Sequence, residues 1–230
     1  MARAAAANAD VAGMTRPGRL ITFEGGEGAG KSTQIEHLAA VLRAAKVDVL
    51  VTREPGGTPS AELIRQLLVE GPPDRWLPLT EALLLLAARH DHVLRRIAPA
   101  LAAGRWVLCD RFMDSTRVYQ GVAGGVGAAM IDGLHATIFG KLRPDLTVIL
   151  DIPVATGLGR RRGASGGQRF EQMTGAFHEK VREGFLALAR AEPKRCAVVD
   201  ATRPIEAVAA DVRDLVARRF GLDLAPSGQS

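Results

Sequence analysis

The sequence predicts an α/β fold, a doubly wound five-stranded parallel sheet flanked by helices, and three observations carry this prediction. Five short apolar segments rich in strand-favouring residues recur along the chain. Segments with apolar residues at helical spacing separate them, and such alternation favours a parallel sheet with right-handed crossovers. A glycine-rich phosphate-binding motif follows the first of the five segments, which is where a P-loop fold carries it.

The predicted strands and helices alternate along the chain. The strands cover residues 20–23, 47–52, 106–109, 146–151 and 196–200. The helices cover residues 33–42, 60–70, 80–103, 128–139, 174–191 and 204–220, and a further helix begins at Pro153 and runs to residues 160–162. Pro99 is expected to kink or break the long third helix, because proline lacks the N–H that a helix interior needs. The glycine-rich run Gly124–Gly127 predicts a loop.

The length of 230 residues suits one domain with a sizeable core, which we place at residues 19–222. Residues 1–18 and 223–230 are predicted to be tails. The first tail is rich in alanine and has no apolar core of the signal-peptide type. The longest apolar run, Ala82–Ala88, is too short to cross a membrane, so no membrane partner is expected.

The net charge of +5 favours acidic partners, a class that includes both nucleotides and nucleic acids. Aromatic residues make up only 4% of the chain and no zinc-finger or RNA-recognition pattern is present, so no nucleic-acid partner is predicted. Cys109 and Cys196 both lie in apolar, strand-like runs. We therefore expect buried free thiols in a reducing, cytoplasmic compartment rather than a disulfide.

The first predicted strand leads into Gly25-Gly26-Glu27-Gly28-Ala29-Gly30-Lys31-Ser32-Thr33, which contains the P-loop pattern G-x-x-x-x-G-K-S. Glycines let backbone N–H groups turn inward, and the following helix adds the positive end of its dipole. These nine residues are therefore the candidate nucleotide-binding residues. Lys31 is expected to reach the outer phosphates, and the Ser32 hydroxyl is expected to bind the Mg²⁺ that accompanies ATP.

A P-loop alone decides neither the base of the nucleotide nor the reaction. The only asparagine is Asn8, in the predicted tail, so the N-K-x-D guanine reader of GTPases is absent. The sequence S-G-G-Q at residues 165–168 resembles the signature of ABC-type transport ATPases. Those enzymes follow an apolar strand with Asp-Glu, whereas here Arg111 follows Asp110 and Ile152 follows Asp151. Phosphoryl transfer to a small acceptor is the interpretation that remains.

Four further segments resemble bacterial thymidylate kinase and occur in the family's order: Thr52–Gly57, Ala87–Arg89, Asp110–Phe112 and Asp114–Gly121. Each is weak alone, but together with the P-loop variant F-E-G-G-E-G-A-G-K-S-T they are specific. The resemblance runs from about residue 19 to residue 220. It implies Mg²⁺-dependent transfer of the γ-phosphoryl group of ATP to dTMP, giving dTDP, by a homodimer with a five-stranded P-loop kinase fold.

The resemblance also implies roles for individual residues. Arg53, Arg89 and Arg111 match family positions around the acceptor phosphate, where planar guanidinium groups suit phosphate oxygens. Transfer between two polyanions is limited by charge repulsion and alignment, so Arg111 and Lys31 are candidate catalytic residues. Glu27 matches an acidic position near the dTMP sugar and the metal.

The base and the metal have their own candidates. Thr116 and Gln120 match positions that read the thymine edge, and glutamine offers both a donor and an acceptor to a base. Asp110 joins Ser32 as a candidate metal ligand.

Residues 158–172 resemble the mobile lid of the family. Because the P-loop of this chain carries no arginine, the resemblance implies a catalytic arginine in the lid. Among Arg160, Arg161, Arg162 and Arg169, we rank Arg169 and Arg161 first. The usual Asp-Arg-x-Glu pattern of the lid appears here as Q-R-F-E at residues 168–171, which leaves Glu171 as the candidate carboxylate.

The chain also departs from the family at the base pocket. Many members have an aromatic residue three or four positions before the helix arginine, and here those positions hold Leu86 and Leu85. Leucine can cover a ring face through dispersion, so Leu85 stays a candidate substrate-binding residue. The departure keeps a kinase for another nucleoside monophosphate or for a deoxynucleoside open as an alternative. A P-loop ATPase that transfers to no acceptor is a third.

Overall fold

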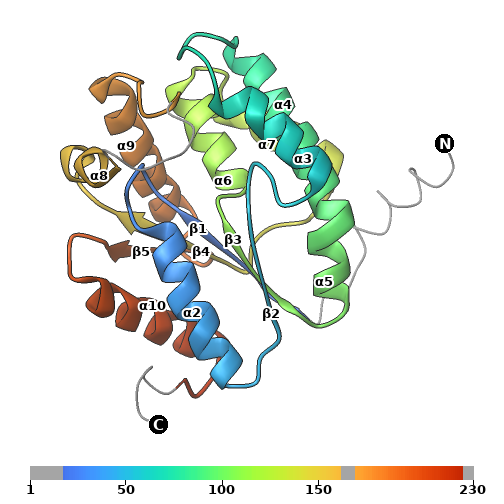
Figure 1. The fold of residues 1–230 in the computed structure, drawn as a ribbon, viewed down its shortest axis with the longest axis vertical. Coiled ribbons are helices and arrows are strands. Elements are labelled where there is room, and N and C mark those ends of the chain that lie inside the picture. Colours follow the sequence, from blue (N-terminus) through green and yellow to red (C-terminus); the bar gives the residue numbers. More distant parts are fainter. Residues whose placement is uncertain (1–17, 162–168, 225–230) are drawn as a thin grey trace, which may run out of the picture.

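Residues 18–161 and 169–224 are described by the computed structural model, in which helices cover both faces of a central sheet (Figure 1). The strands are β1 (Leu20–Glu24), β2 (Val49–Arg53), β3 (Trp106–Asp110), β4 (Leu146–Asp151) and β5 (Cys196–Asp200). They run parallel in the order β2-β3-β1-β4-β5. The predicted doubly wound, five-stranded sheet is thereby confirmed. The predicted tails lie largely outside the described residues.

The register of the strands brings polar residues together at one edge of the sheet. Phe23 of β1 and Arg53 of β2 both lie beside Asp110 of β3, and Glu24 lies beside Ile149 of β4. The carboxyl ends of four strands therefore meet at this edge. In an open parallel sheet this is the edge at which ligands bind.

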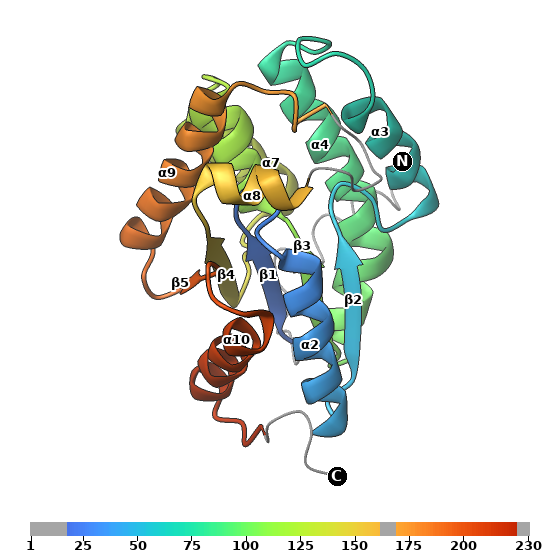
Figure 2. The same ribbon diagram turned by 60° about the vertical axis from the view of Figure 1, so that its left-hand side comes forward.

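Helices cover both faces of the sheet, and one of them, α8 (Val154–Arg161), lies across the ends of the strands (Figure 2). On one face lie α2 (Lys31–Ala44) and α10 (Ile205–Phe220), whose apolar residues share a core cluster with β1 and β4. The remaining helices are α3 (Pro59–Val69), α4 (Pro78–His92), α5 (Ala98–Ala102), α6 (Met113–Thr116), α7 (Ala128–Phe139), α8 (Val154–Arg161) and α9 (Gly175–Ala191). Figure 2 shows α8 lying across the carboxyl ends of β1 and β4, next to the start of α2.

The strands are apolar on both faces, as a covered parallel sheet requires. In β1, Ile21 and Phe23 pack with the α2 and α10 side, whereas Leu20 packs with Leu86 and Leu101 on the opposite side. All three strand residues are fully buried. This two-sided burial fixes the sheet between its helices and so fixes the edge at which the polar residues gather.

The long third helix is continuous, but its winding changes ahead of Pro99. A π-helical segment, η1 (Val93–Ile97), joins α4 to α5, and the N–H of Ala98 donates to the carbonyl of Val93. The ring of an interior proline crowds the carbonyl of the preceding turn, and a wider turn makes room for it. The expected kink at Pro99 therefore takes the form of a π-helical turn just before the proline.

Residues 113–123, to which the sequence assigned no element, are helical. They form α6 and a second π-helical segment, η2 (Arg117–Ala123). Val118 and Tyr119 of η2 are buried against Phe185 of α9. A Cβ at Gly184 would lie 2.9 Å from a methyl group of Val118, so glycine there permits this close approach. The predicted loop at residues 124–127 follows.

Two further expectations concern the cysteines and membrane-spanning segments. Cys109 and Cys196 are both buried and free. Within residues 18–161 and 169–224, no helix has the length and apolar character needed to span a membrane.

Candidate active site

The P-loop turns sharply between β1 and α2. Gly28 and Gly30 have φ of +69° and +87°, a left-handed backbone that favours glycine. A Cβ at Gly28 would also lie 1.9 Å from the carbonyl oxygen of Gly157 in α8. Position 28 is therefore restricted to glycine twice, by its backbone and by the helix that lies on it.

Lys31 and Ser32 begin α2 and face the end of β3. The Nζ of Lys31 donates to the carbonyls of Gly26, at 3.0 Å, and Gly25, at 3.4 Å. Burial and the nearby Arg111 lower the pKa of Lys31, although neighbouring carboxylates oppose this. The Ser32 hydroxyl donates to Oδ2 of Asp110 at 2.7 Å. One hydroxyl and one carboxylate suit Mg²⁺, which takes oxygen ligands and usually keeps several waters.

Arg111 joins the β3 end to the P-loop. Its Nη2 donates to Oε1 of Glu27 at 2.8 Å, and its Nη1 donates to the carbonyl of Gly25 at 3.1 Å. The Tyr119 hydroxyl donates to the same Glu27 oxygen at 3.1 Å. Burial alone would raise the pKa of Glu27, but Arg111 and Lys31 outweigh it and lower this pKa to about 2. Glu27 is therefore a carboxylate at neutral pH.

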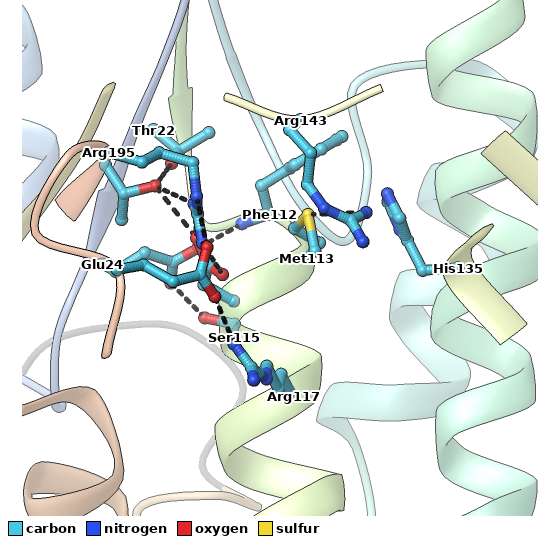
Figure 3. Close-up of polar contacts among 12 residues, drawn as sticks. Thr22, Glu24, Phe112, Met113, Ser115, Arg117, His135, Arg143 and Arg195 are labelled. Atoms are coloured by element: carbon cyan, nitrogen blue, oxygen red, sulfur yellow. Dashed lines mark hydrogen bonds and ion pairs between the residues drawn. The ribbon is translucent and has the colours of Figure 1, made fainter. Parts of the chain in front are cut away.

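A fully buried carboxyl, that of Glu24, supports the segment that carries Arg111 (Figure 3). Glu24 accepts from the Phe112 N–H at 2.8 Å and from the Ser115 hydroxyl at 2.5 Å. Arg111 donates in turn to the Ser115 oxygen at 3.1 Å. Burial, and next the nearby Asp114, raise the pKa of Glu24 to about 8. Arg195 and Thr147 both donate to Asp114, which anchors the same segment to β4.

A second buried network holds Arg89. Its Nε donates to Glu54 at 2.6 Å and its Nη2 donates to the Thr116 hydroxyl at 2.9 Å, while Glu54 also contacts Nδ1 of His92 at 3.0 Å. Burial opposes ionisation of Glu54, but Arg89 and His92 outweigh it and lower its pKa. Among the described residues, neither Nη1 of Arg89 nor Oε1 of Gln120 has a hydrogen-bond partner, although both atoms are buried.

These networks surround one cavity, which we call the acceptor cavity. Eight of the predicted site residues line it: Glu27, Leu85, Arg89, Arg111, Thr116, Gln120, Arg161 and Glu171. Leu85 thus faces the cavity, whereas its neighbour Leu86 is packed in the core. The lining joins apolar and aromatic side chains, among them Leu85, Phe112 and Phe170, with buried donors and acceptors and several cations, which suits an anionic ligand with a polar ring.

Arg53 is placed differently. It lines a separate groove with Ser32, Glu62 and Asp110, on the other side of the β3 end. Its Nη2 donates to both carboxylate oxygens of Glu62 at 3.0 Å. The structure therefore does not bring Arg53 together with Arg89.

The lid arginines differ in where their side chains lie. Arg161 lines the acceptor cavity, and its Nε donates to Glu171 at 2.6 Å. Arg169 is buried and donates to the carbonyls of Leu68, Pro72 and Pro73. Arg160 donates to the carbonyl of Ala201. Arg162 and Gln168 fall outside the described residues.

Four functional candidates were not singled out in the sequence. Glu24, Glu54 and Glu81 are buried carboxylates whose partners lie far away in the chain, and Arg65 lines the acceptor cavity from α3. Glu24 and Glu54 lie within segments that carry the family resemblance, which is the signal that could have found them.

Comparisons with known proteins show which family this chain resembles. A family model described as thymidylate kinase matches residues 23–212. A thymidylate kinase of Caulobacter vibrioides is 55% identical over 205 residues, which cover 89% of this chain and 99% of that protein. One of Dinoroseobacter shibae is 56% identical over 200 residues, covering 86% and 96%. The crystal structure of thymidylate kinase from Ehrlichia chaffeensis superposes with a TM-score of 0.72 at 32% identity, covering 86% of this chain and 98% of that one.

The raised pKa of Glu24 predicts a specific pH dependence of stability. A carboxyl whose folded pKa of about 8 exceeds its ordinary value of 4.5 stabilises the fold fully below the lower value, and this contribution is lost as pH rises to the higher one. Glu24→Gln stays neutral and keeps an acceptor for Phe112. The unfolding free energy of the wild type, relative to this variant, should fall by roughly 3 to 4 kcal/mol between about pH 5 and about pH 8. Denaturant titrations that give parallel pH profiles would contradict this.

Proposed function

Since the chain belongs to the thymidylate kinase family, it phosphorylates dTMP to dTDP with ATP as the phosphoryl donor, and we propose how its residues divide this work. One observation carries the assignment of residues: the P-loop and the acceptor cavity meet at the ion pair between Glu27 and Arg111. A donor phosphate on one side of this pair and an acceptor phosphate on the other would lie within reach of each other.

The P-loop holds the ATP phosphates in this proposal. Lys31 now contacts two P-loop carbonyls, and it would exchange them for the outer phosphates of ATP. Ser32 and Asp110 would hold Mg²⁺, because their oxygens lie together at the start of α2. A Mg²⁺ ion held by these two residues would supply positive charge that offsets the negative charge of the phosphate oxygens.

The acceptor cavity holds dTMP. The unpaired Nη1 of Arg89 is a donor that fits O4 of thymine, so we place Arg89 at the base and not at the acceptor phosphate as the resemblance implied. The unpaired Oε1 of Gln120 is an acceptor that fits the N3–H of thymine. Leu85 would cover the ring face, and Thr116 keeps Arg89 in place. Arg65 and Arg111, two cations in the lining of the cavity, would meet the acceptor phosphate.

Transfer itself requires charge stabilisation and alignment rather than a protein nucleophile. Arg111 is fixed by Glu27, Gly25 and Ser115, and it stays cationic under burial because Tyr119 and Glu27 raise its pKa. Arg161 is the lid arginine that we place at the transferred phosphoryl group, since it lines the cavity while the guanidinium of Arg169 is already occupied.

We also propose a cytoplasmic homodimer that has no membrane or nucleic-acid partner. Support for a dimer comes from apolar side chains that α3, α4 and their connection leave exposed: Leu63, Leu67, Leu77, Leu79 and Leu83. Exposed apolar surface of this kind often marks a protein–protein interface.

A coupled ADP-release assay with ATP, Mg²⁺ and dTMP tests the function. Lys31→Met should lower the rate by at least about 100-fold, because the transition state loses a fixed cation at its developing charge. The other nucleoside monophosphates and thymidine serve as competing acceptors. Turnover with one of them and none with dTMP would overturn the acceptor, and ADP release that is independent of any acceptor would overturn the transfer.

Arg161→Gln and Arg160→Gln form a matched pair within the lid. The first should lower kcat by about 10²- to 10³-fold, as expected when one charge-stabilising donor is removed. The second should change kcat by less than about threefold, because Arg160 is bound to the carbonyl of Ala201. Equal effects of the two substitutions, or a larger loss in Arg169→Gln, would reject Arg161 as the catalytic lid arginine.

A further inference from the structure

Glu81, near the start of α4, is a buried carboxylate that the proposed reaction leaves without a role. Its side chain is 8% exposed. One oxygen, Oε1, accepts from Nε2 of Gln120 at 2.6 Å, and the other forms an ion pair with Arg169. Glu81 is absent from the lining of the acceptor cavity, whereas Gln120 is part of that lining.

The contact with Glu81 determines which way the Gln120 amide faces. An ionised carboxylate only accepts hydrogen bonds, while an amide has a donating and an accepting end. Only the NH₂ group of Gln120 can therefore face Glu81, and its Oε1 is turned elsewhere. That Oε1 is buried without a partner among the described residues, on a side chain that lines the cavity.

Arg169 holds the Glu81 carboxylate in place through their ion pair. Its guanidinium donates to the carbonyls of Pro72 and Pro73, at 3.1 and 2.8 Å, and it is 2% exposed. A buried carboxylate is costly unless a cation is paired with it, and Arg169 is that cation. The chain of contacts from Arg169 through Glu81 to Gln120 thus ends in a single orientation of one amide.

We propose that Glu81, held by Arg169, is a positioning residue that determines base specificity by locking the Gln120 amide with its oxygen towards the acceptor cavity. The cavity then selects pyrimidine bases whose N3 carries a proton, as in thymine and uracil. Cytosine would place the N3 lone pair against the Gln120 oxygen and leave two acceptors facing each other. A site built to accept a hydrogen bond rejects a ligand that cannot donate it. The inference rests on the proposed binding of dTMP in this cavity.

Glu81→Gln tests the lock, because a neutral amide at position 81 can donate or accept and so lets Gln120 rotate. Dissociation constants for dTMP and dCMP are measured by titration calorimetry, with competition against dTMP for the weaker ligand. Binding of dTMP should weaken about tenfold, and that of dCMP should stay unchanged or strengthen, so that the preference for dTMP falls at least about tenfold. The KM for ATP and the kcat at saturating dTMP should stay within about threefold of the wild type.

Two further variants make the outcome decisive. Glu81→Gln combined with Arg169→Gln removes the unpaired buried cation, so it tests the same loss of preference if the single variant unfolds. Glu183→Gln removes an exposed carboxylate of α9 and should leave both constants unchanged. Equal weakening of dTMP and dCMP, with the preference intact, would show a structural role only and overturn the proposal. A wild-type protein that binds no dTMP would instead overturn the proposed function.

Discussion

The ion pair between Arg111 and Glu27 joins the two loops on which the site is built. Arg111 follows β3 and Glu27 lies in the P-loop after β1, so the 2.8 Å contact spans two neighbouring strands. Burial disfavours the charged form of each residue, and the opposite charge of its partner stabilises that charged form. Because Arg111 also donates to the carbonyl of Gly25, the phosphate loop and the acceptor side keep one relative position. Alignment of the two reacting groups is a main contribution of the protein to phosphoryl transfer.

The same kind of pair recurs around the acceptor cavity, where four buried or half-buried arginines are each held by a carboxylate, whereas Arg65 donates to the carbonyl of Pro55. The pairs are Arg111 with Glu27, Arg89 with Glu54, Arg161 with Glu171, and Arg169 with Glu81. These carboxylates hold the cations in place before a phosphate arrives. They leave specific donors and acceptors unpaired, and those atoms can then meet the ligand.

Much of this arrangement could be predicted because it is local in sequence. The P-loop is a contiguous motif, and the family resemblance, which assigns a base-covering residue to a position just before Arg89, implies Leu85, which lines the cavity. The direction of Arg53 could not be predicted in this way. It ends β2 at the expected edge, but its guanidinium is paired with Glu62 in another groove, because α3 supplies a carboxylate there. Glu24 and Glu81 were missed because their partners, Ser115 and Gln120, are distant in the chain and only packing brings them together.

A crystal structure with dTMP and a non-hydrolysable ATP analogue with Mg²⁺ tests the central claim most directly. We expect the dTMP phosphate beside Arg111, with thymine O4 at Nη1 of Arg89 and N3 at Oε1 of Gln120. This expectation would be contradicted by dTMP bound in the groove of Arg53 and Glu62. It would equally be contradicted by a complex in which the pair of Arg111 and Glu27 separates to admit the ligand.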